Sequence, residues 1–213
     1  MRATIVVLTC LMFIAGGCAT QRPVTDVMAS GDRALSRGDY AGAVAEFEEV
    51  TNRYPGDWRA QYKLGLALIE LGDYTPARRA LEIAHTRRPQ ENAIVEALAE
   101  AMFRQGNHEQ LYAFLQQRVD KTQSVDSCLR LARYCIAIDD PDSAQHAIDL
   151  AMEWDGGRTA EPFIVAAELA QHVGDEARAM QLLQSGYEVN PHDRRIGQRL
   201  RALGMVPGPT MPR

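Results

Sequence analysis

Four cysteines are the residues with the widest range of possible chemistry in this sequence. Cys128 and Cys135 stand seven residues apart in a segment with a helical pattern. At a helical rise of ~1.5 Å per residue their Cα atoms would be about 10.5 Å apart, whereas a disulfide needs them within ~7 Å. No histidine stands beside them at the spacing of a helical metal site. We therefore expect two small, buried core residues that keep free thiols and bind no metal.

The other residues capable of catalysis do not converge on a recognisable motif. The histidines are scattered along the chain, at His85, His108, His146, His172 and His192. The sequence has no His-x-x-x-His pair, no glycine-rich phosphate loop and no Gly-x-Ser-x-Gly nucleophile motif. Acid pairs such as Glu48-Glu49 and Asp139-Asp140 fit solvated helix faces and turns. We expect no enzyme, no cofactor and no small-molecule substrate.

Composition limits the class of protein and of partner. The chain has 213 residues, of which 46% are hydrophobic, 24% charged and 7% aromatic. Ala, Leu, Glu and Arg are plentiful, and these residues favour helix over strand. The formal charge is −5 and no run of five basic residues occurs. Nucleic acid is therefore not an expected partner, because phosphate binding needs a concentrated positive face.

The first eighteen residues have the pattern of a secretory signal. Arg2 precedes an apolar run over residues 3–14, and Ala15, Gly16 and Gly17 then lead to Cys18. Twelve residues span ~18 Å as a helix, which is short of the roughly 30 Å hydrocarbon core of a bilayer. The small residues before Cys18 resemble the processing box of bacterial lipoproteins, although Ala15 stands where that family usually has Leu.

The lipoprotein resemblance implies a cellular location as well as a membrane anchor. Residues 1–17 would be removed, Cys18 would be acylated as the mature N-terminus, and residues 18–23 would form a tether. Ala19 in place of Asp favours the outer membrane, with the protein facing the periplasm. A plain signal peptide cut near Ala19 and an uncleaved anchor are the alternatives.

A 34-residue period dominates the rest of the chain. Gly38, Gly72, Gly106 and Gly174 lie on one lattice, with Asp140 in the slot between the last two. Other columns with this period are Ala43, Ala77 and Ala179; Pro55, Pro89 and Pro191; Gly31 and Gly65; and Tyr40 and Tyr74. Agreement among independent columns indicates repeated structural units.

Each unit has the pattern of two helices and a break. In the second unit the apolar positions Leu64, Leu68 and Leu71 predict a helix, which Gly72 ends because glycine tolerates the left-handed conformation. A second amphipathic helix follows, and Pro89 closes the unit. The small residue Gly65 would let the two helices approach closely. Helix pairs repeated at a fixed period predict an all-α solenoid.

These residues resemble the tetratricopeptide repeat family. Its Leu-Gly, Ala, large apolar and Pro signature is found as Leu64-Gly65, Ala77, Leu81 and Pro89, and the first unit has Gly31, Ala43, Phe47 and Pro55. The resemblance implies a right-handed α-α superhelix of about five helix pairs. We place the units at 24–57, 58–91, 92–125, 126–159 and 160–193, a capping helix at 194–204 and a disordered tail at 205–213. Unit four lacks the Gly and the Pro, and its second helix reads one residue early.

The family also implies a concave face lined by the first helix of each unit, with groove residues at the second, fifth, ninth, twelfth and thirteenth positions. These positions are Arg59, Tyr62, Leu66, Ile69 and Glu70 in unit two, and Glu96, Glu100, Phe103 and Arg104 in unit three. Large apolar groups beside arginine are typical of binding hot spots. Alternatively, Tyr62 or Phe103 packs against the neighbouring unit. The mixed sign of the charges argues against a simple clamp for acidic tails of the chaperone type.

The function that these features favour is a membrane-anchored adaptor of the cell envelope. It would bind an extended or helical segment of another envelope protein in the concave groove, while lipid on Cys18 holds it to the membrane. An assembly factor resembling the β-barrel assembly lipoprotein or the type IV pilus pilotin has the same layout, by analogy of architecture. A self-associating structural solenoid and a hydrolase or transferase hidden in the repeats are further alternatives.

Overall fold

The computed structural model describes residues 21–205, and within this range it contains eleven helices and no strand. The predicted signal sequence, Cys18 and residues 206–213 of the predicted tail lie outside the described residues. The helices are α1 (Val24–Ser36), α2 (Tyr40–Arg53), α3 (Trp58–Leu71), α4 (Tyr74–Arg87), α5 (Asn92–Arg104), α6 (His108–Thr122), α7 (Val125–Ala137), α8 (Pro141–Asp155), α9 (Glu161–His172), α10 (Glu176–Val189) and α11 (Arg194–Ala202). The predicted all-α class is confirmed.

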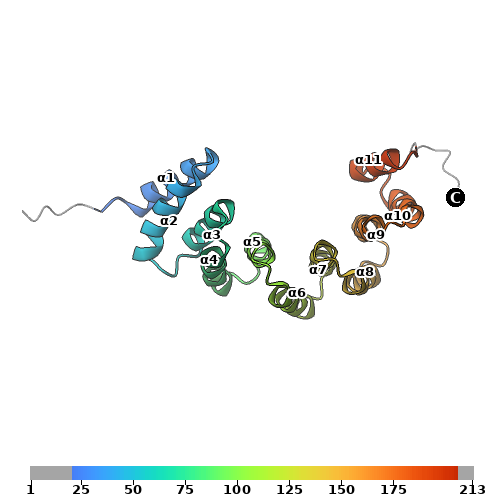
Figure 1. Cartoon of the computed structure of the whole chain (residues 1–213), viewed down its shortest axis with the longest axis horizontal. Helices are drawn as coiled ribbons and strands as arrows, with labels where there is room; N and C mark the ends of the chain where they lie inside the picture. Colours follow the sequence, from blue (N-terminus) through green and yellow to red (C-terminus); the bar gives the residue numbers. More distant parts are fainter. Residues whose placement is uncertain (1–20, 206–213) are drawn as a thin grey trace, which may run out of the picture.

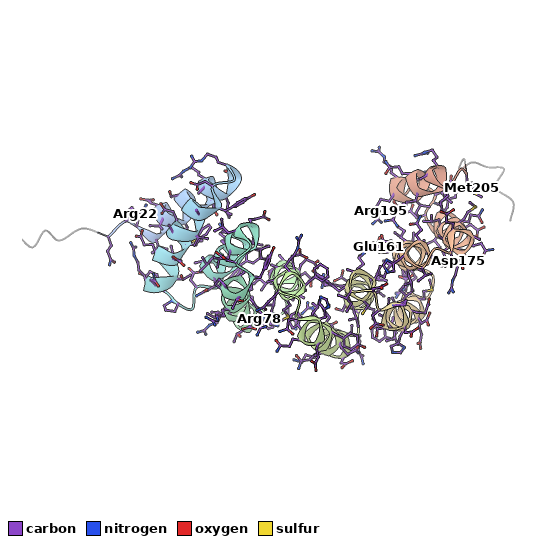
Figure 2. All side chains as sticks on the ribbon, in the orientation of Figure 1. Arg22, Arg78, Glu161, Asp175, Arg195 and Met205 are labelled. Atoms are coloured by element: carbon purple, nitrogen blue, oxygen red, sulfur yellow. The ribbon has the colours of Figure 1, made fainter. Side chains whose placement is uncertain are left out.

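Successive helices pack as pairs that stack along one direction, which confirms the predicted solenoid (Figure 1). The stack curves into an arc. Helices α3, α5, α7 and α9 run along its inner side, while α4, α6, α8 and α10 run along its outer side. Figure 2 shows Glu161 and Arg195 on the inner side and Arg78 on the outer side. The first helix of each unit therefore lines the concave face.

Left-handed glycines make most of the turns inside the pairs. Gly38, Gly72, Gly106 and Gly174 have φ angles of 74°, 83°, 76° and 81°, which glycine adopts without steric cost. An aspartate often follows and caps the next helix, as Asp175 does by accepting a hydrogen bond from the Arg178 backbone N–H at 2.9 Å. The turn glycines therefore explain the strongest column of the repeat pattern.

Unit four departs from this scheme at its turn. Asp139, and not the Asp140 of the glycine lattice, takes the left-handed conformation, with a φ of 61°, which aspartate tolerates better than most residues. Asp140 instead caps α8, because its carboxylate accepts a hydrogen bond from the Ser143 backbone N–H at 3.1 Å. Both helices of the unit consequently begin one residue early, at Val125 and Pro141. The repeat returns to its lattice after Gly156 and Gly157, which also have positive φ angles of 60° and 76°.

Close packing within a pair depends on small residues opposite large ones. A Cβ atom added to Gly31 would lie 2.5 Å from Phe47 Cε1, and one added to Gly65 would lie 2.4 Å from Leu81 Cγ. The two contacts are equivalent positions of units one and two. The expected close approach at Gly65 is confirmed, and Phe47 and Leu81 are fully buried as a result.

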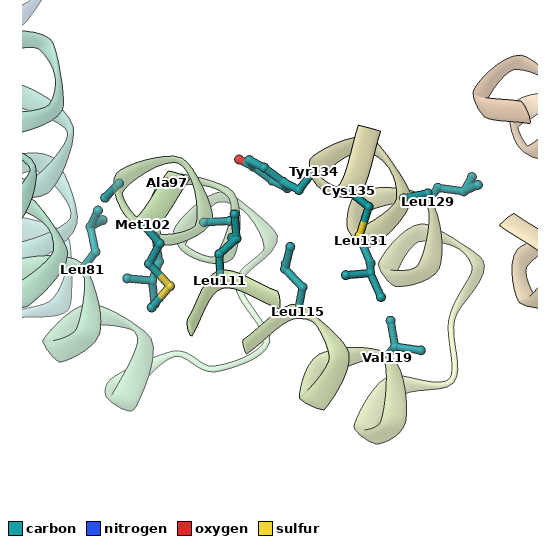
Figure 3. Packing of buried hydrophobic residues seen from close by; sticks show 14 of the residues in the cluster. Leu81, Ala97, Met102, Leu111, Leu115, Val119, Leu129, Leu131, Tyr134 and Cys135 are labelled. Atoms are coloured by element: carbon teal, nitrogen blue, oxygen red, sulfur yellow. The ribbon is translucent and has the colours of Figure 1, made fainter. Parts of the chain in front are cut away.

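Buried side chains form a core that runs through most of the stack. One cluster extends from Ala34 in α1 to Leu169 in α9. Figure 3 shows how Leu111, Leu115 and Val119 of α6 fill the space between α5 and α7. Burial of each such side chain contributes about 1.5–3 kcal/mol. The core is thus a continuous seam between neighbouring units, as a solenoid requires.

The C-terminal units have a second cluster, which α11 closes. Ile196 and Leu200 of α11 are fully buried against α9 and α10. The arginines of this helix divide into two groups. Arg194 and Arg201 are exposed, but Arg195 and Arg199 reach back to acids on α9. The capping helix therefore contributes charge to the concave face.

The two cysteines of α7 have the expected structural role. Cys128 and Cys135 are buried free thiols, with exposed fractions of 0% and 1%. Burial raises the pKa of both thiols to about 11, since it disfavours the thiolate. They are therefore unreactive in the folded protein at neutral pH. Across residues 21–205, no helix combines the length and apolarity needed to span a bilayer.

Candidate binding groove on the concave face

A hollow of about 340 Å³ opens on the concave face between α5 and α7. Three of the predicted groove residues, Glu96, Glu100 and Phe103, line its α5 side. The α7 side is lined by Asp126, Arg130, Arg133, Tyr134 and Ala137. First helices of adjacent units thus bring acidic, basic and aromatic side chains to one place.

Two aromatic rings form the apolar part of this hollow. The ring centroids of Phe103 and Tyr134 are 5.7 Å apart, and Phe103 also stacks on His108 at 6.0 Å. Phe103 is half-buried and packs against the main core, whereas the Tyr134 ring is almost fully buried. Phe103 therefore packs against the neighbouring unit, as the alternative predicted, and it also lines the hollow.

The Tyr134 hydroxyl lies on the concave side of the hollow. Figure 3 shows the Tyr134 side chain reaching from α7 towards α5, above Leu111 and Leu115. Its hydroxyl lies 3.4 Å from Glu96 Oε1 and 3.4 Å from Glu100 Oε2. Burial raises the pKa of Tyr134 far above its usual value, and the two neighbouring carboxylates raise it further. Tyr134 therefore stays a neutral hydrogen-bond donor.

Ion pairs join α5 and α7 around the hollow. Arg130 donates to Glu96 Oε2 at 2.6 Å and to Asp126 Oδ2 at 3.0 Å. Arg130 is mostly buried, with 11% of its side chain exposed, while Glu96 and Asp126 are more than half exposed. Glu100 pairs with Arg104 of its own helix at 2.7 Å. The rim of the hollow is consequently charged and open to solvent.

The C-terminal part of the concave face is a network of arginines and glutamates. Arg133 of α7 contacts Glu161 at 2.6 Å and Glu168 at 3.4 Å, both on α9. From the other side, Arg195 contacts Glu161 at 2.6 Å and Arg199 contacts Glu168 at 2.5 Å. Burial alone would raise the pKa of Glu161, but hydrogen bonds from Arg195 and Arg133 bring it below its usual value. Glu161 is therefore ionised at neutral pH.

The remaining predicted groove residues lie elsewhere on the α3 side. Ile69, Glu70 and Arg104 line a second hollow of about 300 Å³ near the α3–α4 turn. Arg59 lines a third, at the α2–α3 turn, where its guanidinium lies 4.8 Å from the Trp58 ring. Tyr62 and Leu66 are half-buried and pack against the main core. The role of all nine residues in binding stays a prediction.

Sequence reasoning missed the contribution of α7. Applied to unit four, the groove positions of the 34-residue lattice include Arg130, Tyr134 and Ala137, whereas the observed register, one residue earlier, adds Asp126 and Arg133. Residues from both registers line the hollow. The lattice held enough signal to find three of the five. The ion pairs of Arg133 could not be found in this way, because they depend on the cap helix and α9 approaching together.

The comparisons with known proteins decide the nature of the repeats. Residues 28–78 and 67–110 match the family model of the tetratricopeptide repeat. This part of the chain is similar to tetratricopeptide repeats. Proteins built from tetratricopeptide repeats generally act as non-catalytic scaffolds that bind peptide or protein partners. No curated protein matches the sequence.

Solved structures extend the fold assignment beyond the matched residues. TTC0263, a thermophilic tetratricopeptide-repeat protein of Thermus thermophilus, is 20% identical, with a TM-score of 0.55 over 85% of this chain and 98% of its own. MamA from residue 41 onward, of Desulfovibrio magneticus RS-1, is 16% identical, with a TM-score of 0.59 over 83% and 99%. YrrB, described as having an unusual peptide-binding site, is 14% identical, with a TM-score of 0.53 over 84% and 92%. At these identities the likeness shows a shared fold. The solenoid fold of these proteins therefore extends over nearly the whole described chain.

Proposed function

We propose that this tetratricopeptide-repeat protein is a lipid-anchored adaptor of the bacterial cell envelope. Its concave groove would bind an extended or helical segment of another envelope protein. The observation that carries the proposal is the hollow between α5 and α7, where the half-buried Phe103 ring and the edge of Tyr134 meet solvent-exposed charges. Such a combination provides both apolar area and charged groups that select a partner.

The local structure at Arg22 supports a short tether to a membrane. The Arg22 guanidinium pairs with Glu46 and Glu49, and its carbonyl accepts a hydrogen bond from Arg53 Nη1 at 2.7 Å. Arg22 is thus fixed on α2, only four residues beyond Cys18. Four residues reach ~14 Å at most. A lipid on Cys18 would therefore keep the N-terminal repeat close to the bilayer surface.

Metabolic labelling tests the anchor. In cells fed a radioactive palmitate, the protein should incorporate the label and sediment with membranes. Cys18→Ala should abolish both, because the thioether and the processing site are lost together. Absence of label from the wild-type chain would refute the lipid anchor, and the groove function would then have to be considered for a protein without one.

Crosslinking in cells tests the groove. A photoreactive phenylalanine analogue at position 103 should capture one reproducible envelope protein, because Phe103 lines the hollow. The matched control is position 83, since Ile83 is an exposed apolar residue of α4, on the outer side of the arc. Equal capture from both positions, or no capture from position 103, would contradict the groove proposal. The identity of the captured protein distinguishes an assembly factor from other adaptors.

A further inference from the structure

Neighbouring first helices are joined by ion pairs that cross from one repeat to the next. Lys63 contacts Asp32 across 31 residues, Arg130 contacts Glu96 across 34, and Arg199 contacts Glu168 across 31. In each case an acid on one helix meets a base on the helix that follows. At these three places a carboxylate on the inner side of the solenoid is matched by a cation one repeat further along.

Glu100 pairs with Arg104 of its own helix and not with a cation one repeat further along. The base nearest to it one repeat further along is Arg133, 33 residues on. The guanidinium of Arg133 is instead engaged by Glu161 and Glu168 on α9. From its own helix, Arg104 neutralises only Oε1 of Glu100. The other oxygen faces the hollow.

The Tyr134 hydroxyl lies near the second oxygen of Glu100, where a cation would otherwise stand, and it is only a weak donor. Oε2 of Glu100 and Oε1 of Glu96 share one hydroxyl hydrogen of Tyr134, and both lie 3.4 Å from its oxygen. A good hydrogen bond between two oxygens is about 2.5–3.0 Å long. Glu96 and Glu100 are also one helical turn apart, where like charges repel and destabilise a helix. Two carboxylate oxygens therefore share one distant hydroxyl donor and are otherwise open to solvent or to a bound group.

The walls of the hollow suit the stem of a long cationic side chain. Phe103 and Tyr134 provide aromatic carbon beside the two carboxylates, and aromatic faces attract cations. The volume of about 340 Å³ is at the lower end for binding pockets, so one long side chain fits better than a bulky ligand. The bases that line it, Arg130 and Arg133, are already paired with acids. Three acids at the hollow, Glu96, Glu100 and Asp126, therefore share two bases, Arg104 and Arg130, which leaves one negative charge unmatched, although Arg130 Nη1 itself has no acceptor.

We propose that this hollow receives a lysine or arginine side chain of the partner segment. The charged end lies between Glu96 and Glu100, and the methylene stem packs against Phe103 and Tyr134. The inference rests on the proposed groove function and specifies the chemistry of its partner. The segment that binds therefore has a basic residue next to apolar ones.

Selection from a phage-displayed library of random ten-residue peptides tests this directly, with the full chain in detergent micelles as bait. Selected peptides should share one lysine or arginine with an apolar neighbour. In a synthetic selected peptide, replacing that base by glutamine should weaken binding about tenfold, which is ~1.4 kcal/mol. On the Glu100→Gln variant the same replacement should change affinity less than about twofold, because the carboxylate that the base contacts is gone. Glu153→Gln, at an exposed position of α8, should behave as wild type.

The outcomes separate this inference from the groove function. Peptides without a basic residue that still lose binding in Phe103→Ala would overturn the basic anchor and leave the groove function standing. A tenfold effect that persists in Glu100→Gln would also overturn it. Failure to select any peptide would overturn it as well, and crosslinking from position 103 would then decide whether the groove binds a partner at all.

Discussion

Replacement of Gly65 by alanine tests the packing on which the repeat depends. A Cβ atom at this position would lie 2.4 Å from Leu81 Cγ and 2.8 Å from Leu81 Cδ2. Carbon atoms in contact prefer ~3.5–4.0 Å, so helices α3 and α4 would have to separate by about 1 Å or Leu81 would have to leave its position. Both changes disturb a fully buried side chain.

Two opposing effects set the magnitude. Overpacking of this kind typically costs about 1–3 kcal/mol, while alanine in a helix interior is favoured over glycine by ~1 kcal/mol. We therefore expect Gly65→Ala to lower the free energy of unfolding by about 1 kcal/mol. In a Leu81→Ala background, which itself costs roughly 2–5 kcal/mol, the clash is removed. There the same glycine substitution should stabilise by ~1 kcal/mol, so the coupling energy is about 2 kcal/mol.

Urea denaturation of the four proteins, followed by far-ultraviolet circular dichroism, measures this cycle. Ala113→Gly, at an exposed position of α6, supplies the helix-propensity effect alone and should cost ~1 kcal/mol with or without Leu81. Gly65→Ala effects that agree in the two backgrounds within about 0.5 kcal/mol would show that close approach is not why glycine is needed here.

Three further predictions follow from the charges, thiols and turns. The pKa of Glu161 is lowered in the folded chain, so its contribution to stability is present above the ordinary carboxyl pKa of 4.5 and is lost as the pH falls through the lower, folded-state value. Hydrogen-exchange protection of α11 should therefore drop with acidification, and Glu161→Gln should remove most of this pH dependence. Cys128 and Cys135 should not react with iodoacetamide at pH 8 unless urea is added, because burial raises the pKa of both thiols to about 11; rapid alkylation of the folded chain, read by mass spectrometry, would contradict their burial. Gly72→Ala should cost about 1 kcal/mol in urea denaturation, since the φ of 83° is strained for any residue with a Cβ atom, whereas an unchanged midpoint would indicate that the turn relaxes freely.

The sequence predicted the helices and their pairing because the repeat columns record local requirements. Gly72 ends a helix and Gly65 permits close approach, and both requirements recur every 34 residues. Unit four shows the limit of this reasoning. Its turn uses Asp139, whose side chain gives only a weak signal for the left-handed conformation, so the lattice alone could not place the unit to within one residue.

The candidate site was predictable only from one side. The α5 residues Glu96, Glu100 and Phe103 follow from the position of the first helix in its unit. Which of them face a hollow depends on what the next helix presents, and that depends on the register of α7. The engagement of Arg133 by α9 depends in turn on Arg195 and Arg199 sharing the same acids. Such three-helix arrangements are not encoded in the spacing of any single unit.

The inner surface of the arc changes its chemistry from one end to the other. On α3 it presents the half-buried apolar groups Tyr62, Leu66 and Ile69, whereas on α9 it presents Glu161 and Glu168 with their arginines. A surface of uniform chemistry would bind a peptide equally well in either direction. Here the two directions of a bound peptide are not equivalent, because reversal would place the apolar end of the peptide on the charged helices. A polypeptide bound along this surface should therefore prefer one direction, with its apolar end nearer the N-terminal repeat.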